Sequence, residues 1–148
     1  KKNLKTHRCL VPADGFYAWK KVGKKTTVPW RIVLKSKEVF SLAGMWEEYD
    51  DHEGNSVHTF SIITVSAEKW ISEITEQMPV IFSREDEKIW LDKNTMEDQL
   101  IALLKIYPAD LLEGYNISPA INSVDKDGPS LIIPTPAADQ FGNLTLFD

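Results

Sequence analysis

The strongest constraint on the fold of this chain is the order of its secondary-structure patterns. Strand patterns fill the first half, and helix patterns appear only later. Apolar and β-branched runs separated by turn residues predict strands over residues 9–11, 16–19, 30–34, 39–49 (bending at Gly44) and 57–65. Short helices are expected after N-caps at Ser66, Ser83 and Asn94 or Thr95, and brief strands at 115–117 and 131–133. Because strands and helices do not alternate, the sequence predicts an α+β fold with a largely antiparallel sheet.

Length and composition fit one soluble globular domain over residues 1–148, since no linker or repeat divides the 148 residues. The single cysteine, Cys9, excludes an intramolecular disulfide. No apolar run approaches the roughly 20 residues that span a bilayer, and no signal-peptide pattern is present. We therefore expect a cytoplasmic chain with no membrane partner. Its net charge of −5 argues mildly against strong nucleic-acid binding.

Generic chemical motifs are missing from the sequence. It has no phosphate-binding glycine loop, dinucleotide fingerprint, His-Glu-x-x-His or Cys-x-x-Cys motif, so we expect neither a cofactor nor structural zinc. His52 and His58, close to Asp50 and Asp51, are compatible with a metal site or with a solvated hairpin tip. The neighbouring Gly-Asn pair favours the hairpin tip, and we expect no metal.

Two further features have a structural and a functional interpretation. The apolar neighbours of Cys9 favour an inert core thiol over a nucleophile. The densest basic cluster comprises Lys20, Lys21, Lys24 and Lys25. A charged hairpin tip usually only improves solubility, yet on an acidic protein it is also the edge best suited to phosphate contacts.

Residues 8–19, RCLVPADGFYAW, combine turn residues and aromatics in an order that packing alone does not dictate. They resemble the R-C-[LI]-[VI]-P-A-D-G-[FWY]-[FY]-E-W signature of the SOS response-associated peptidase family, the abasic-site processing proteins. Further matches follow in family order at residues 43–46, 60–64, 74–79, 115–122 and 129–134. The resemblance covers nearly all of the chain up to Pro134 and implies the family's curved, barrel-like sheet with short helices packed around it. Residues 137–148 form a tail beyond the usual family end.

The resemblance implies a specific chemistry. Members of the family bind single-stranded DNA and use an N-terminal cysteine whose amine and thiol condense with the aldehyde of an abasic site, giving a DNA–protein crosslink. An Asn, the Glu of the F-[FY]-E-W motif and the His of an I-H-x-R-M-P motif surround that cysteine. An acid and a base that move protons at such an aldehyde typically contribute about 10²–10⁴ in rate.

The family's catalytic residues are not found at the matching positions of this chain. The nucleophile and the Asn segment would precede Lys1, so we expect the chain, which starts Lys1-Lys2-Asn3, to lack the family's N-terminal segment. The Glu position is Ala18, the His position is Thr75, and the following Arg position is Gln77. Neither alanine nor threonine titrates near neutrality. We therefore expect no retained catalytic residue, either in a divergent member with weakened acid–base machinery or in a degenerate, truncated one.

The DNA-contacting positions are better retained. The predicted nucleic-acid contacts are Trp19, Lys20, Lys21, Thr64, Gln77, Met78 and Pro79. Trp19 is either a platform for an unstacked base, worth about 1–3 kcal/mol, or a core tryptophan. Because Gln77 replaces an arginine, we expect a monomer that binds single-stranded or abasic DNA weakly and in a salt-sensitive way. The alternatives are a non-catalytic single-stranded DNA-binding module and a protein-interaction module that reuses the fold.

Overall fold

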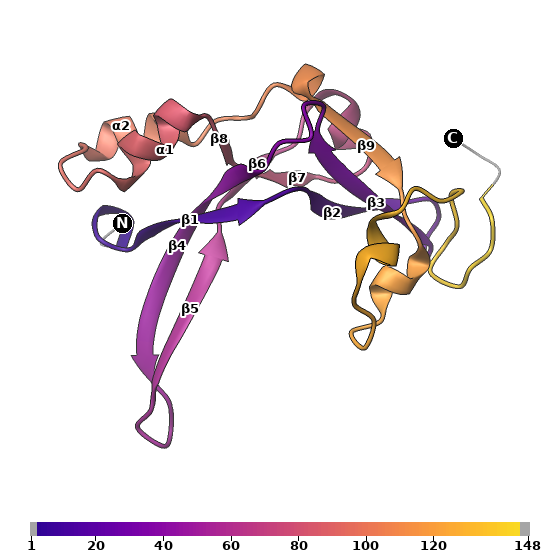
Figure 1. The fold of residues 1–148 in the computed structure, drawn as a ribbon, viewed down its shortest axis with the longest axis horizontal. Coiled ribbons are helices and arrows are strands. Elements are labelled where there is room, and N and C mark those ends of the chain that lie inside the picture. Colours follow the sequence, from indigo (N-terminus) through magenta and orange to yellow (C-terminus); the bar gives the residue numbers. More distant parts are fainter. Residues whose placement is uncertain (1–2, 146–148) are drawn as a thin grey trace. The chain divides into compact units, whose positions relative to one another are not determined.

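The computed structural model describes residues 3–145, which form two compact units, each assembled from separate chain segments (Figure 1). Unit 1 contains the described residues up to Ala13 together with Val39–Ser66 and Gln77–Tyr107. Unit 2 contains Asp14–Glu38, Ala67–Glu76 and the described residues from Pro108 onward. The single domain and the tail from residue 137 stay predictions. Lys1, Lys2 and residues 146–148 lie outside the described part.

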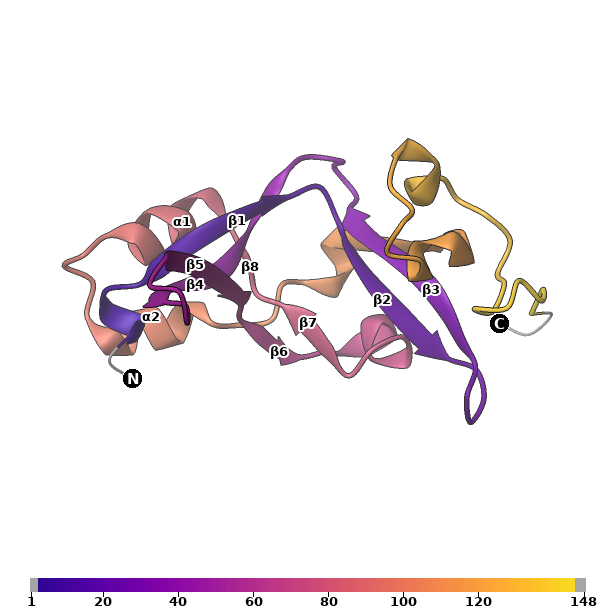
Figure 2. The same ribbon diagram turned by 90° about the horizontal axis from the view of Figure 1, so that it is seen from below.

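Unit 1 is built on a four-stranded antiparallel sheet. Its strands are β1 (Arg8–Ala13), β4 (Phe40–Asp50), β5 (Ser56–Ile62) and β8 (Ile81–Phe82). They run in the order β1-β4-β5, and β8 pairs with β4. A separate two-stranded ribbon joins β6 (Thr64–Ser66) to β7 (Gln77–Pro79), which Figure 2 shows from below.

Two short helices accompany this sheet, α1 (Arg84–Leu91) and α2 (Glu97–Leu103), and the short 3-10 helix η1 (Asn3–Lys5) precedes β1. The core cluster of unit 1 joins the sheet to both helices through Ala43, Val80, Phe82, Trp90, Leu100 and Leu103. Ser83 caps α1 as predicted, because its Oγ accepts a hydrogen bond from the Asp86 N–H at 3.2 Å. No helix within residues 3–145 is long and apolar enough to cross a membrane.

Unit 2 contains a three-stranded antiparallel sheet in the order β2-β3-β9. The strands are β2 (Phe16–Lys21), β3 (Thr27–Leu34) and β9 (Leu112–Asn116). Four 3-10 helices belong to the same unit: η2 (Lys69–Glu73), η3 (Ala109–Leu111), η4 (Pro119–Asn122) and η5 (Pro129–Ile132). Fully buried side chains in this unit include Ile32, Ile71, Leu112 and Ile117.

The antiparallel α+β class is confirmed, and four local predictions are wrong. The strand expected over residues 57–65 is two strands, β5 and β6, which belong to different sheets. Ser66 caps no helix, because it is the last residue of β6 and η2 begins after Glu68. The second helix begins after Met96 rather than at Asn94 or Thr95, since the Met96 N–H donates to the Gln99 amide oxygen at 3.3 Å. The expected strand 131–133 is a 3-10 turn that starts at a proline, whose fixed φ suits a helical start. The described strands form three separate open sheets, so the barrel-like description holds only loosely.

Candidate functional site

Strand β2 lies at the edge of its sheet and has two different faces. Tyr17, Trp19 and Lys21 are exposed, whereas Ala18 between them is only 4% exposed. Successive residues of a strand point to opposite faces, which explains this alternation. Trp19, the predicted platform for a base, and Ala18, at the family's glutamate position, therefore lie on opposite faces of one strand.

Trp19 is 40% exposed, so the core interpretation is wrong and its ring is accessible. Its indole N–H donates to the Asn122 side-chain oxygen at 2.9 Å, which fixes one edge of the ring. Tyr17 is 39% exposed on the same face. Residues two apart in a strand are separated by about 6.6 Å, so the two rings form a short aromatic stripe. Neither Tyr17 nor Asn122 was predicted as a site residue, although the alternation along residues 16–21 could have suggested Tyr17.

Arg31 lies across from Tyr17 on the same face and is paired within the protein. Its guanidinium is 2.8 Å from the Asp14 carboxylate and donates to the Tyr115 hydroxyl at 2.9 Å. The Tyr115 hydroxyl in turn donates to the Ile132 carbonyl at 3.0 Å. Burial alone would lower the pKa of Arg31, but the hydrogen bonds to Tyr115 and Asp14 outweigh it and raise the pKa. Arg31 therefore supports the sheet beneath the stripe.

The lysine cluster adjoins this stripe. Lys20 and Lys21 end β2, and Lys24 and Lys25 lie in the loop before β3. Among the described residues, none of these four ammonium groups forms an ion pair with a carboxylate. Their charge is therefore available to phosphates.

The opposite face of β2 carries Ala18 at one end of a cross-strand row. Ala18 pairs in register with Trp30, and Trp30 pairs with Asn116. The indole N–H of Trp30 and the side-chain N–H of Asn116 are buried, and neither has a hydrogen-bond partner within the described part of the chain. The methyl group of Ala18 offers them no acceptor. This row therefore has donors but no acid or base.

Thr75 is half-buried and belongs to the segment that follows η2 in unit 2. Its backbone N–H donates to the Ile71 carbonyl at 3.0 Å. A threonine hydroxyl, like the alanine methyl group, does not titrate near neutral pH. Thr75 and Ala18 thus supply no proton-transfer group.

The remaining predicted contacts lie on the β6–β7 ribbon of unit 1. Thr64 pairs in register with Pro79, and its hydroxyl forms a hydrogen bond with the Gln77 side-chain oxygen. Thr64 and Gln77 are exposed, whereas Met78 is fully buried and Pro79 is buried. The ribbon therefore brings these four residues together. Their contact with DNA stays a prediction.

Cys9 is half-buried in β1, opposite Gly44. A Cβ atom added at Gly44 would lie 2.7 Å from the Cys9 sulfur, so only glycine leaves room for this side chain. Burial raises the pKa of the Cys9 thiol, which reduces the fraction of reactive thiolate. Both observations support the interpretation of Cys9 as an inert thiol.

The histidine and aspartate residues around the β4–β5 turn form a solvated hairpin tip. The Asp51 carboxylate accepts hydrogen bonds from the backbone N–H groups of Glu53 and Asn55, each at 2.9 Å. Hydrogen bonds from Asn55 and then Glu53 lower the pKa of Asp51. Within residues 3–145, no three His, Cys, Asp or Glu side chains are grouped to hold a metal ion.

A family model described as SOS response associated peptidase (SRAP) matches residues 1–124. The chain belongs to the SOS response-associated peptidase family. It is 44% identical over 133 residues to abasic site processing protein YoqW of Bacillus subtilis, covering 89% of this chain and 59% of that protein. It is 28% identical to abasic site processing protein HMCES of Rattus norvegicus, covering 88% of this chain and 44% of that protein. The chain thus spans 59% and 44% of the lengths of these two relatives.

Solved structures agree with this family assignment. A crystal structure of a protein from Bacteroides thetaiotaomicron matches with a TM-score of 0.82 and 26% identity, over 90% of this chain and 59% of that one. A crystal structure of a phage-related protein from Bordetella bronchiseptica matches with a TM-score of 0.65 and 25% identity, over 78% of this chain and 55% of that one. The family resemblance seen in the motifs is therefore confirmed.

Proposed function

We propose that this family member binds single-stranded DNA, including abasic-site DNA, along the exposed face of β2, and that its crosslinking chemistry is impaired or lost. One observation carries the proposal. The alternation of β2 presents two aromatic rings and a lysine to solvent, while the family's glutamate position is a buried alanine, Ala18. A cytoplasmic location and a monomeric state stay predictions that accompany this proposal.

The aromatic stripe supports the binding half of the proposal. Every base has a π-face, so stacking on Trp19 and Tyr17 needs no particular sequence and contributes about 1–3 kcal/mol per base. The adjacent lysines can neutralise phosphates, each adding about 0.7 to the slope of log affinity against log salt for single strands.

The charge distribution also supports binding at β2. Five acidic side chains lie between Met45 and Ile62, a segment of unit 1 without lysine or arginine. The charge of this segment, −5, therefore accounts for the whole formal net charge of the chain. The rest of the chain is therefore neutral overall, and the end of β2 is locally basic. The acidic composition is thus compatible with a basic edge on unit 2.

The catalytic half of the proposal rests on Ala18 and Thr75. Family chemistry needs groups that exchange protons near neutral pH, and neither side chain does so. Losing one general acid or base typically costs about 10²–10⁴ in rate. We therefore expect crosslinking at abasic sites to be slow or undetectable.

DNA binding is tested by fluorescence anisotropy with a labelled, undamaged single strand at low and at physiological salt. Trp19→Ala should weaken binding about 5- to 150-fold, the equivalent of one lost stacking contact. The double variant Lys20→Gln/Lys21→Gln should reduce the salt slope by about 1.4. Ile101→Ala, on an exposed position of α2, is the matched control and should bind normally. Equal binding by Trp19→Ala and the control would contradict the proposed contact.

Catalytic impairment is tested by incubating the chain with single-stranded DNA that carries one abasic site. We expect no heat-stable crosslink on a denaturing gel, and an efficient crosslink would disprove impairment. A variant with an added N-terminal cysteine, Ala18→Glu and Thr75→His should gain crosslinking if the scaffold is intact. The same variant without Ala18→Glu serves as its control and should react more slowly.

A further inference from the structure

The β4–β5 hairpin of unit 1 extends beyond the end of β1 (Figure 1). The last pairing between β1 and β4 joins Arg8 to Met45, whereas β4 and β5 remain paired as far as Asp50 and Ser56. The distal part of the hairpin is therefore a two-stranded ribbon. Isolated two-stranded hairpins are only marginally stable in water. Apolar side chains that such a ribbon exposes to solvent are not needed for a core, so we ask what they could bind.

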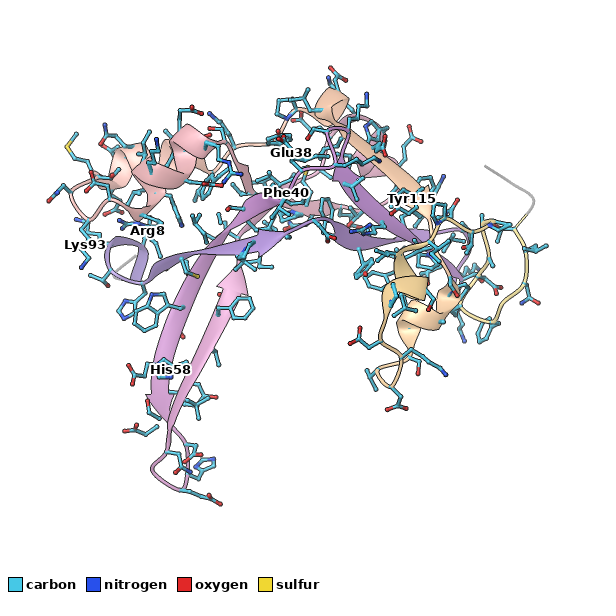
Figure 3. All side chains as sticks on the ribbon, viewed as in Figure 1. Arg8, Glu38, Phe40, His58, Lys93 and Tyr115 are labelled. Carbon is cyan, nitrogen blue, oxygen red and sulfur yellow. The ribbon has the colours of Figure 1, made fainter. Side chains whose placement is uncertain are left out.

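Aromatic rings gather on one face of this hairpin. Trp46 and Phe60 are paired in register, and so are Glu48 and His58, which places all four on the same face. The Trp46 ring centroid lies 4.6 Å from that of His7 and 6.5 Å from that of His58, and the latter pair is stacked. Phe60 is 64% exposed. We call His7, Trp46, His58 and Phe60 the hairpin aromatic face; Figure 3 shows His58 on the distal part of the hairpin.

The charge of the hairpin is uniformly negative. The acidic residues of the hairpin are Glu47, Glu48, Asp50, Asp51 and Glu53. The pairing register places Glu48 and Asp50 on the same face as Trp46 and Phe60. No lysine or arginine occurs between Glu38 and Lys69. Acidic groups of this density repel phosphates, so a nucleic acid is a poor occupant of this face. They attract cations, and aromatic faces bind guanidinium groups well.

The structure already shows a guanidinium against a tryptophan in unit 1. Arg8 lies 5.8 Å from the centroid of the Trp90 ring while it also donates to backbone carbonyls. The hairpin aromatic face offers a similar ring, Trp46, with carboxylates in place of carbonyls. Its Glu48 carboxylate is half-exposed and lies 3.6 Å from the His58 ring nitrogen.

We propose that the hairpin aromatic face is a docking surface for an arginine-bearing, basic segment of a partner protein. Guanidinium groups of that segment stack on Phe60, the exposed ring of this face, and form ion pairs with Glu48 and Asp50. This proposal does not depend on DNA binding at β2, because it concerns different residues in the other unit and a ligand of opposite charge.

The test uses the full chain and a fluorescein-labelled peptide of alternating arginine and valine, with the length of β5, measured by anisotropy. An alternating glutamate–valine peptide is the charge control. We expect binding of the basic peptide only, weakened by salt. Phe60→Ser should weaken it at least about threefold, and Glu48→Gln should weaken it and reduce its salt dependence. Ile101→Ser, a matched exposed apolar position on α2, should leave it unchanged.

Several outcomes would overturn the proposal. Absence of binding at low salt, equal binding of both peptides, or equal effects of Phe60→Ser and Ile101→Ser would each do so. Displacement of the basic peptide by labelled single-stranded DNA would identify the face as a nucleic-acid surface instead. Concentration-dependent dimerisation that Phe60→Ser abolishes, without peptide binding, would assign the face to a second copy of the chain. Trp19→Ala separates the two proposals, because it should weaken DNA binding and spare peptide binding.

Discussion

Replacing Arg8, the first residue of the family signature, tests what holds unit 1 together. Its guanidinium donates to the carbonyls of Leu4 and Lys5, at 2.7 and 2.8 Å, and to those of Trp90 and Asp92, the latter at 2.8 Å. One side chain thus links the segment before β1 to the C-terminal end of α1. The C-terminus of a helix favours a cation, because its last carbonyls lack intrahelical partners.

The stability lost in Arg8→Met depends on which of the four hydrogen bonds of Arg8 are shielded from water. The bonds to Leu4 and Trp90 are partly buried, and a hydrogen bond to a charged group is worth about 1.5–3 kcal/mol. The two exposed bonds exchange readily with water and add little. The cation–π contact with Trp90 adds about 0.5–1 kcal/mol. Because the bonds to Leu4 and Trp90 are only partly buried, each counts near the lower end of its range, and we expect a loss of about 3–5 kcal/mol in the free energy of unfolding of unit 1.

Urea unfolding and amide hydrogen exchange in β1 and α1 measure this loss directly. A loss of this size lowers the melting temperature by roughly 10 °C in a chain of this length. Arg84→Met is the matched control. Arg84 is exposed, and its ion pair within residues 3–145 is with Glu87 at 3.8 Å, so its replacement should cost less than about 0.5 kcal/mol. An Arg8→Met protein as stable as the control would refute the reasoning.

Three further predictions concern unit 2. Gly114→Ala should lower stability by about 1–3 kcal/mol in thermal unfolding, because the new methyl group would lie 2.9 Å from the Trp70 ring; an unchanged melting temperature would contradict this. Hydrogen bonds from its own turn lower the pKa of Asp139. Its stabilisation is therefore present above about pH 3.9 and lost as the pH falls through the lowered value, and Asp139→Asn should remove this dependence from urea midpoints measured against pH. Asp14→Asn should cost about 1–2 kcal/mol in urea unfolding, since it leaves the buried Arg31 guanidinium without its carboxylate partner, which is itself largely exposed; a neutral effect would show that the Tyr115 hydroxyl and the Asp14 backbone carbonyl, 3.4 Å away, satisfy Arg31.

The sequence predicted the strands well where local pattern and tertiary role agree. The runs beginning at Cys9, Phe16 and Trp30 fall within β1, β2 and β3, because apolar, aromatic and β-branched residues between turn signals suit strands, and the burial of β2 alternates. The Ser83 cap was predictable for a similar reason, since its hydroxyl has a local partner three residues later. Such features depend on neighbouring residues only.

The wrong predictions involve partners that are distant in sequence. Ser66 has the composition of an N-cap, but pairing with Gln77 holds its backbone in a ribbon. The Thr95 hydroxyl donates to the Ile89 carbonyl of the preceding helix at 2.8 Å, which orients it toward that helix, and the next helix begins only after Met96. Strand alternation places Trp19 and Ala18 on opposite faces, but which of the two faces is exposed depends on packing against residues that are distant in sequence. Sequence reasoning could also not distinguish a core tryptophan from an exposed one.

The cross-strand row that contains Ala18 links the sequence departure to its physical consequence. Trp30 and Asn116 keep buried N–H donors in register with position 18, yet the residue there has no acceptor. A buried donor without a partner lowers the free energy of unfolding by about 1–3 kcal/mol. Removing a carboxylate from position 18 would leave the Trp30 and Asn116 donors in this state. A carboxylate at position 18 would lie on the same face as both donors, which would hold it in the charged form. Under the proposed function, these two donors would bind a glutamate at position 18, so we expect Ala18→Glu to fit this row without rebuilding its neighbours.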